Sequence, residues 1–266
     1  MTERLNIYIY SKYDDDSLDK KSKVTDALIH EGFTMTETSQ DANIILSIGS
    51  DGSFLQAVRQ TGFRQDCLYA GLSLTGKHGL YCDFHYNNLF EMTQAIRNSD
   101  IEVRRYPIIE VTIDNRRPFY CLNEFSIRSN IIRTFVLDVI IDDELFETFL
   151  GDGLIISTPT GSTAYNKSVK GAVVDPLLPC FQVTELASVN NNKYRTLGSS
   201  FILSRERKLR LYVHQDGNDF PLMAADNEAL GMRNVKNVDI ILSEKTIKTV
   251  KLKNNSFWEK VQRIYL

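Results

Sequence analysis

Hydrophobic positions in the first hundred residues follow two alternating patterns. Apolar runs that indicate buried strands occupy residues 5–10, 43–48 and 67–72, and a further strand is expected over residues 33–38. Between them, apolar residues recur at helical spacing, in the sets Val24, Ala27 and Leu28; Phe54, Leu55 and Val58; and Leu89, Met92, Ala95 and Ile96. Ser17 is a candidate N-cap for the first helix. Strands that alternate with helices predict a parallel α/β sheet.

The pattern changes close to residue 100. Apolar residues then alternate with polar ones, as in the sets Ile109, Val111 and Ile113; Leu209, Leu211 and Val213; and Val238, Ile240 and Leu242. This period of two predicts antiparallel sheet with one solvated face, interrupted by one helix within residues 164–171. We therefore expect an α/β domain over residues 1–100 and a β-rich domain over residues 101–249. The aromatic and aliphatic tail, about residues 250–266, is expected to dock on the folded protein.

Composition excludes several classes of protein. The chain has 266 residues, of which 42% are hydrophobic and 24% charged, and its net charge is −3. This balance gives no basic surface for nucleic acid or for an anionic membrane. The four cysteines form no C-x-x-C pair, so free thiols are expected rather than a zinc site. Neither a signal pattern nor a membrane-spanning apolar run is present, and a cytoplasmic protein is expected.

The first group of residues with chemical potential is Gly49-Ser50-Asp51-Gly52-Ser53, which lies between an apolar strand and a helix. Ligands of open α/β sheets bind beyond the carboxyl ends of strands, and a helix N-terminus there favours phosphate. A carboxylate among phosphate-binding groups suits proton transfer or metal binding. The alternative is a tight turn in which Asp51 only caps the helix.

The second group runs from Gly151-Asp152-Gly153 through residues 157–168, where seven side chains carry hydroxyl groups. Hydroxyls and amides at a helix start can bind ribose and phosphate oxygens, and Tyr165 offers a face for a base. An ordinary hydroxyl-rich turn with an N-cap is the alternative. Two smaller features follow strands: Asn123-Glu124 and the possible ligand-lining loop at residues 74–81. For Asn123-Glu124 a solvated turn is the alternative.

These groups, in this order, resemble the NAD kinase family. Residues 49–53 are similar to its Gly-Gly-Asp-Gly-Thr signature, Asn123-Glu124 to its Asn-Glu pair, and residues 75–81 to its Thr-Gly-x-x-Gly-x-Tyr stretch. Residues 151–165 are similar almost residue for residue to its GDG-x-x-x-STPTGSTAY segment. The resemblance spans essentially the whole chain. A Gly-Asp-Gly motif alone would extend to lipid kinases and phosphofructokinases, whereas the combination does not.

The resemblance implies phosphorylation of NAD at the 2′-hydroxyl of its adenosine ribose by ATP, with Mg²⁺ or another divalent cation. It implies an α/β domain, a β-rich domain, an active site in the cleft between them, and a C-terminal tail that returns to the first domain. It also implies a homodimer or homotetramer in which a neighbouring subunit completes the NAD site. Neither nucleic acid nor membrane is an expected partner.

Residue roles follow from the same resemblance. Asp51 would be the general base, and Gly52 and Ser53 would contact phosphates. Asn123 and Glu124 would hold the adenosine portion of NAD. The other expected ligand-site residues are Leu80, Tyr81, Asp152, Ser157, Thr163, Ala164, Tyr165, Ser168, Ala187, Val189 and Asp226.

The chain departs from the family pattern at a few positions. Ser50 replaces the usual second glycine, and its Cβ would crowd a phosphate if this position required positive φ or close backbone approach. Ser53 replaces threonine and keeps the hydroxyl, while Leu80 stands where an aromatic residue is common. Asn227 and Glu228 also differ from relatives. Two rival functions stay open: a catalytically weak dinucleotide sensor, and a related lipid or sugar kinase.

Overall fold

The structure is a computed structural model that describes residues 6–11, 15–75, 79–98, 100–131, 134–215, 220–253 and 255–266, with only the backbone for residues 15–18. The chain divides into two compact units. Unit 1 comprises Met1–Tyr106 and Thr246–Leu266, and unit 2 comprises Pro107–Lys245. The two divisions fall inside the long strands β6 (Ile101–Ile113) and β17 (Asn237–Leu252). Each unit is described by itself.

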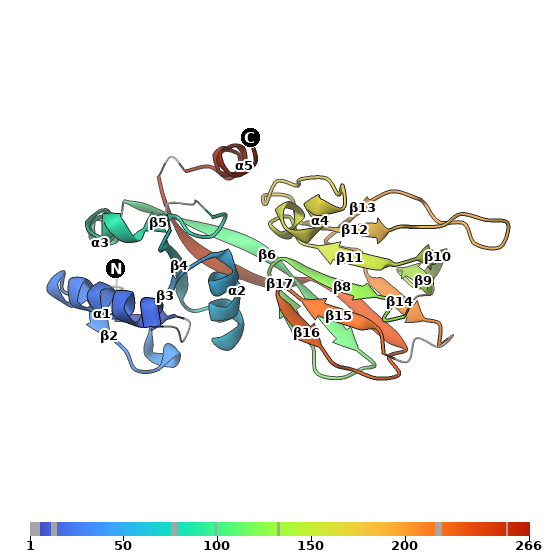
Figure 1. The fold of residues 1–266 in the computed structure, drawn as a ribbon, viewed down its shortest axis with the longest axis horizontal. Helices are drawn as coiled ribbons and strands as arrows, with labels where there is room; N and C mark the ends of the chain where they lie inside the picture. Colours follow the sequence, from blue (N-terminus) through green and yellow to red (C-terminus); the bar gives the residue numbers. More distant parts are fainter. Residues whose placement is uncertain are drawn as a thin grey trace. The chain divides into compact units, whose positions relative to one another are not determined.

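Unit 1 is an α/β unit (Figure 1). Its helices are α1 (Asp15–His30), α2 (Asp51–Gln60), α3 (Leu89–Arg97) and α5 (Phe257–Tyr265), with short 3₁₀ turns at Ser39–Asp41 and Tyr86–Asn88. Its strands are β1 (Asn6–Tyr10), β2 (Thr34–Met35), β3 (Ile44–Ile48), β4 (Leu68–Ser73) and β5 (Phe84–His85), together with the unit 1 portions of β6 and β17.

The sheet of unit 1 is parallel. Its strands lie in the order β17-β4-β3-β1-β2, with β5 also paired to β4. All five residues of β3 are buried, as expected for a strand covered on both faces. Helices α1 and α3 contribute Val24, Leu28 and Met92 to one hydrophobic cluster with the strands. The predicted α/β class of the first third is confirmed.

Unit 2 is built mainly of strands. They are β7 (Phe119–Cys121), β8 (Glu124–Arg128), β9 (Phe135–Ile141), β10 (Glu144–Gly151), β11 (Gly153–Ser157), β12 (Cys180–Leu186), β13 (Phe201–Ser204), β14 (Leu209–Val213), β15 (Leu222–Ala225) and β16 (Glu228–Leu230). One sheet has the antiparallel order β13-β12-β11-β8-β15-β16, and β10, β9, β14 and β17 pair antiparallel in another. Apolar side chains of both sheets form one core. The predicted β-rich class is confirmed.

Element boundaries show where pattern and structure differ. The predicted N-cap at Ser17 is wrong, because α1 already begins at Asp15. The predicted strand at residues 33–38 shrinks to the two residues of β2. The predicted helix within residues 164–171 is a single turn, α4 (Tyr165–Ser168), after a 3₁₀ turn at Gly161–Thr163. All four cysteines are buried, and none of them forms a disulfide. No helix in the described ranges is long and apolar enough to cross a membrane.

The segment between β12 and β13 is held by two glutamates. Glu147, on β10, accepts a hydrogen bond from the backbone N–H of Leu197 at 2.7 Å, and Glu185, on β12, accepts from that of Gly198 at 3.0 Å. Burial raises the pKa of Glu147 from 4.5 to about 7; the Leu197 N–H opposes this increase and the nearby Glu185 adds to it. The contact between Glu147 and Leu197 therefore includes a carboxyl group whose pKa is near neutrality.

We expect Glu147→Gln to raise the melting temperature more at pH 8 than at pH 5. Since the folded chain keeps a proton that the unfolded chain releases, stability falls as pH rises from about 4.5 to about 7. A glutamine removes this dependence while its carbonyl still accepts from Leu197. Thermal unfolding at both pH values checks the prediction. Glu144→Gln, at the exposed start of β10, is the control, and a pH-independent gain in Glu147→Gln would contradict it.

Candidate active site

The loop that carries Asp51 joins the end of β3 to the start of α2. Ser50 is the N-cap residue of α2, and its backbone N–H donates to Ser53 Oγ at 3.4 Å. Ser50 has φ −102° and an exposed side chain. The position therefore needs no left-handed backbone, and a serine fits it without the strain that positive φ would impose. Since Ser50 is the N-cap, the alternative in which Asp51 caps the helix is wrong.

The carboxylate of Asp51 is held by a segment about thirty residues further along the chain. Its Oδ2 accepts from the N–H of Leu80 at 2.7 Å, and its Oδ1 accepts from the N–H of Tyr81 at 2.9 Å. A Cβ at Gly79 would lie 2.2 Å from Asp51 Oδ1, so only glycine allows the backbone this close. Both oxygens are thus fixed by main-chain donors, an arrangement suited to a carboxylate.

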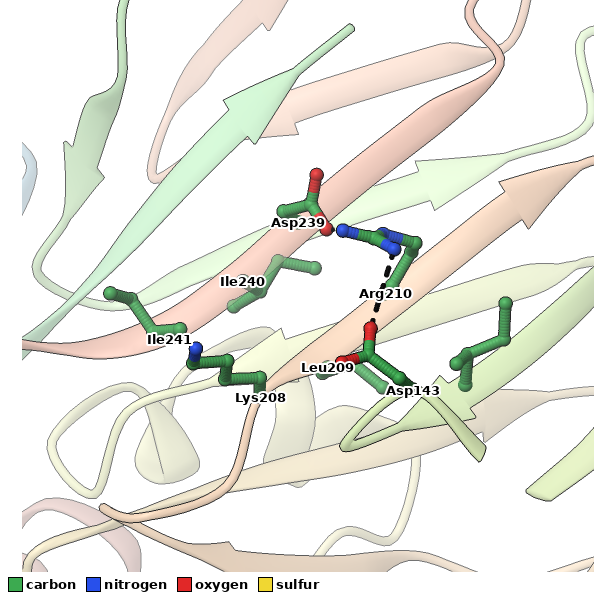
Figure 2. A pocket seen from close by; sticks show the side chains of 8 residues that line it. Asp143, Lys208, Leu209, Arg210, Asp239, Ile240 and Ile241 are labelled. Carbon is green, nitrogen blue, oxygen red and sulfur yellow. Dashed lines mark hydrogen bonds and ion pairs between the residues drawn. The ribbon is translucent and has the colours of Figure 1, made fainter. Parts of the chain in front are cut away.

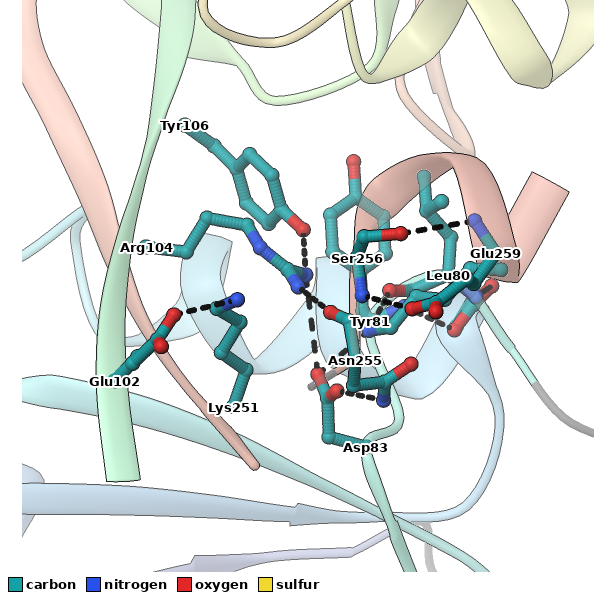
Figure 3. Close-up of polar contacts among 12 residues, drawn as sticks. Leu80, Tyr81, Asp83, Glu102, Arg104, Tyr106, Lys251, Asn255, Ser256 and Glu259 are labelled. Carbon is teal, nitrogen blue, oxygen red and sulfur yellow. Dashed lines mark hydrogen bonds and ion pairs between the residues drawn. The ribbon is translucent and has the colours of Figure 1, made fainter. Parts of the chain in front are cut away.

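Tyr81 and Leu80 are buried beside this contact. The ring of Tyr81 stacks on Phe54 of α2 at 4.9 Å between centroids and meets the ring of Tyr106 edge-on at 5.7 Å. Tyr81 is 3% exposed and Leu80 is 5% exposed. Figure 3 shows both residues beside Asp83 and Asn255. In this structure the main chain of Leu80 and Tyr81 serves Asp51, while the Tyr81 side chain belongs to the core of unit 1.

In unit 2, the Asn123-Glu124 pair and the hydroxyl-rich segment lie together. Strands β8 and β11 pair so that Glu124 stands opposite Ser157. The next residue, Thr158, donates its N–H to the carbonyl of Asn123 at 2.8 Å and its hydroxyl to that of Leu122 at 2.6 Å. A Cβ at Gly161 would lie 1.9 Å from the carbonyl oxygen of Asn123. The two motifs therefore form one close-packed group, neither being a solvated turn.

Asp226 ties the same group together from the turn between β15 and β16. Its carboxylate accepts from the N–H groups of Leu122 at 3.1 Å, Asn123 at 2.7 Å and Glu124 at 3.2 Å. Asp226 has φ +52°, a conformation that aspartate tolerates better than most residues. Asn227 and Glu228, which depart from the family pattern, are exposed. Through these three hydrogen bonds, Asp226 fixes the main chain next to Glu124.

Glu124 carries a polar atom that the described residues leave unsatisfied. It is 8% exposed, and its Oε2 is buried with no hydrogen-bond partner among them. Burial raises its pKa from 4.5 to about 8, and the nearby charge of Asp226 adds to the increase. The hydroxyl of Ser157, opposite Glu124, likewise lacks a partner in the described ranges. A buried polar group of this kind favours a ligand that brings the missing hydrogen bond.

Arg128, at the end of β8, contacts Tyr165 and lines a cavity together with Asp152. Arg128 donates to the Tyr165 hydroxyl at 3.1 Å, and its guanidinium lies 5.8 Å from the ring centroid. Arg128 and Asp152, with Ser129, Ile131 and Leu222, line a cavity of about 300 Å³. Asp152 is exposed, and its backbone N–H donates to the carbonyl of Leu186 at 2.8 Å.

The remaining predicted residues of unit 2 differ in burial and in their contacts. Val189 donates its N–H to the carbonyl of Leu150 at 2.7 Å and is 41% exposed, and Ala187, with φ +46°, is also exposed. Thr163 is buried, with its hydroxyl on the carbonyl of Thr160 at 2.9 Å. Ala164 precedes α4, and Ser168 ends it with an exposed side chain.

A small hollow elsewhere in unit 2 contains none of the predicted residues. Figure 2 shows Arg210 in it, paired with Asp239 at 2.6 Å and with Asp143 at 3.5 Å. Its volume of about 70 Å³ is too small for a nucleotide. Within the part of the chain that the structure describes, no three His, Cys, Asp or Glu side chains gather as a metal site.

Sequence reasoning missed two residues that act on the predicted ones. Arg128 is the last residue of β8, directly after the buried residues Phe125, Ser126 and Ile127, and a charge at the end of such a run was the available signal. Lys260, in α5, is 0% exposed and donates to the carbonyl of Leu80. No pattern distinguishes it from the neighbouring surface charges of that helix.

Comparisons with known proteins agree over the full chain. Residues 122–252 match the family model of the ATP-NAD kinase C-terminal domain. The chain is 62% identical to NAD kinase 2 of Bacillus subtilis, with 99% of each chain covered, and 57% identical to NAD kinase 2 of Bacillus anthracis, with 100% of each covered.

Two solved structures share the fold. Yeast NADH kinase complexed with NADH has a TM-score of 0.84 at 20% identity, with 98% of this chain and 87% of that chain covered. An NAD kinase from Archaeoglobus fulgidus in complex with ATP has a TM-score of 0.76 at 22% identity, with 97% and 99% covered. With its full-length relatives above 50% identity, the chain belongs to the NAD kinase family.

Proposed function

We propose that this protein transfers the γ-phosphoryl group of ATP to the 2′-hydroxyl of the adenosine ribose of NAD, giving NADP and ADP. The observation that carries the proposal is the Asp51 carboxylate, which follows a parallel strand and is fixed through both oxygens by main-chain N–H groups. Relatives named NAD kinase 2 cover the whole chain, which supports the same substrates. The intact Asp51 and the unstrained backbone of Ser50 weigh against the alternative of a weak sensor.

In the proposed reaction Asp51 is the general base. The ribose 2′-oxygen forms a bond to the γ-phosphorus while the bond from that phosphorus to the β,γ-bridging oxygen breaks. Asp51 accepts the hydroxyl proton, and ADP leaves with the bridging oxygen. A fixed carboxylate is effective here because most of the acceleration in phosphoryl transfer comes from alignment and charge stabilisation. Gly52 and the hydroxyl of Ser53, at the start of α2, would contact phosphate oxygens.

We propose that Asn123 and Glu124 hold the adenosine of NAD. The unsatisfied Oε2 of Glu124 can accept from a ribose hydroxyl or from the adenine amino group. Asp152, Tyr165, Ser168, Ala187 and Val189 would line the rest of the dinucleotide pocket. Mg²⁺ would enter with ATP, since this ion is usually bound by substrate phosphates with one or two carboxylates, and it would neutralise phosphate charge.

The proposal extends to the setting of the enzyme. We infer a cytoplasmic homodimer or homotetramer in which a neighbouring subunit completes the NAD site. The exposed apolar side chains Val189, Leu197 and Ile202 on unit 2 suit contact with a second copy.

Replacement of Asp51 tests the proposed base. Asp51→Asn should lower kcat for NADP formation by about 10²–10⁴-fold, because removal of a positioned base has a cost of this order. NADP formation from NAD and Mg²⁺-ATP is followed enzymatically, and calorimetry reports whether NAD still binds. Asp19→Asn, an exposed carboxylate on α1, serves as the control and should keep full activity. Equal kcat in Asp51→Asn would remove this residue as the base, and no NADP from the unaltered protein would overturn the function.

Titration of Glu124 tests the adenosine site. With a pKa of about 8, its carboxyl is mostly protonated at pH 7 and mostly ionised at pH 9. If the ionised form accepts from the ligand, the dissociation constant of NAD should fall by about tenfold between pH 7 and pH 9. Glu124→Gln has no such titration, so its dissociation constant should change little over this range. Isothermal calorimetry makes the comparison, and parallel pH profiles for the two proteins would exclude Glu124 from the adenosine site.

A further inference from the structure

A chain of buried hydrogen bonds connects Asp51 to α5, and all its members belong to unit 1. Lys260 Nζ donates to the carbonyl oxygen of Leu80 at 2.8 Å and to Asp83 Oδ2 at 2.6 Å. The side chains of Lys260 and Asp83 are 0% and 1% exposed. A lysine is almost never fully buried unless it is paired, and here the pair lies against the segment that holds Asp51.

A single peptide group lies between the two opposite charges. The peptide from Leu80 to Tyr81 presents its carbonyl oxygen to Lys260 and its N–H to Asp51 Oδ1, at 2.8 and 2.9 Å. Because a peptide is planar and trans, its C=O and N–H point in opposite directions. The Lys260 ammonium and the Asp51 carboxylate therefore hydrogen-bond to opposite sides of the same planar peptide. Hydrogen bonds in such a series polarise one another, so the ammonium strengthens the N–H as a donor to Asp51.

Asp83 gives Lys260 a fixed position. It also accepts from the side-chain amide of Asn255, and the main-chain carbonyl oxygen of Asn255 accepts from Arg104 at 2.6 Å (Figure 3). Arg104 lies 4.0 Å from Asp83 Oδ2. Burial lowers the pKa of Lys260, and the adjacent Asp83 opposes this change. At the start of α5, Ser256 Oγ accepts from the Glu259 N–H at 3.1 Å, and Glu259 Oε2 accepts from the Ser256 N–H at 2.7 Å. The helix that delivers Lys260 is thus well capped.

We propose that Lys260 is a positioning residue for Asp51, acting through the Leu80–Tyr81 peptide. The role rests on the proposed phosphoryl transfer, in which Asp51 must meet the 2′-hydroxyl in a defined orientation. Lys260 contacts the carbonyl side of the peptide, so it affects the orientation of the base and not the binding of either substrate. Its removal should lower kcat with little change in KM.

The variants must separate positioning from the general cost of a buried charge. Lys260→Met alone leaves Asp83 buried with only the Arg104 guanidinium, 4.0 Å away, as a counter-charge, which is destabilising. The double variant Lys260→Met with Asp83→Asn removes both charges and keeps the side-chain volumes similar. The matched control is Lys251→Met. Lys251 pairs with Glu102 at 2.6 Å in the same unit, and within the described residues it forms no hydrogen bond with Leu80.

The kinetic test is a mutant cycle with Asp51. We expect the double variant to lose at least tenfold in kcat, with KM for NAD within threefold of the unaltered enzyme, while Lys251→Met keeps both values. In an Asp51→Asn background, the double substitution should cause no further loss, because its effect passes through the missing base. Full kcat in the double variant, or a loss that multiplies with that of Asp51→Asn, would overturn the proposal.

Hydrogen–deuterium exchange tests the same link without activity. By mass spectrometry, the peptide that contains the Leu80 and Tyr81 amides should exchange faster in the double variant than in the unaltered protein. Lys251→Met should leave its exchange unchanged. Unchanged exchange in the double variant would overturn the proposal even in an active enzyme. A different result would be that the unaltered protein makes no NADP while the double variant still exchanges faster than the unaltered protein. That result would overturn the proposed function and retain the link from Lys260 to Asp51.

Discussion

Carboxylates withdrawn from water must find hydrogen-bond donors, and for Asp51 and Asp226 the donors are main-chain N–H groups from distant parts of the sequence. Asp51 binds those of Leu80 and Tyr81, 29 and 30 residues away. Asp226 binds three N–H groups more than a hundred residues earlier in the chain. Each of these hydrogen bonds holds the aspartate carboxylate and the backbone segment that donates to it. Asp51, Asn123 and Glu124 are therefore positioned through main-chain hydrogen bonds, whereas Tyr165 accepts from the side chain of Arg128.

The fold was largely predictable because its elements have strong periodicity. The fully buried β3 and the alternating burial of β14 follow directly from their residues. Asp51 could be assigned to the end of a strand by the same reasoning. Its bond to residues 80 and 81 could not, because no local pattern records which main-chain donors a carboxylate reaches. Lys260 was equally hidden: the tail was expected to dock through its aromatic and aliphatic residues, and nothing in its sequence shows that a lysine is buried with them.

The hydroxyl-rich segment shows why a motif can be recognisable without every residue in it serving a ligand. Thr158 and Thr160 turn their hydroxyls to the carbonyl of Leu122, and Ser162 donates to that of Pro159. These three side chains fold the segment against its neighbours. Ser157 is buried and unsatisfied within the described residues, whereas Ser168 is exposed. The motif thus combines residues that shape the turn with residues open to other partners, and its chemistry alone does not separate the two.

The bond between Lys260 and Leu80 also has a consequence for biosynthesis. The two residues are 180 positions apart, so the ribosome completes Leu80 long before it adds its partner. At about 5–20 residues per second, this interval lasts on the order of 10–40 s. During that time the nascent α/β unit contains Asp51 and the segment at Leu80, but not the Lys260 ammonium that later donates to the carbonyl of Leu80. Helix α5 therefore completes the hydrogen bonding of the segment at Leu80, which is synthesised 180 residues earlier.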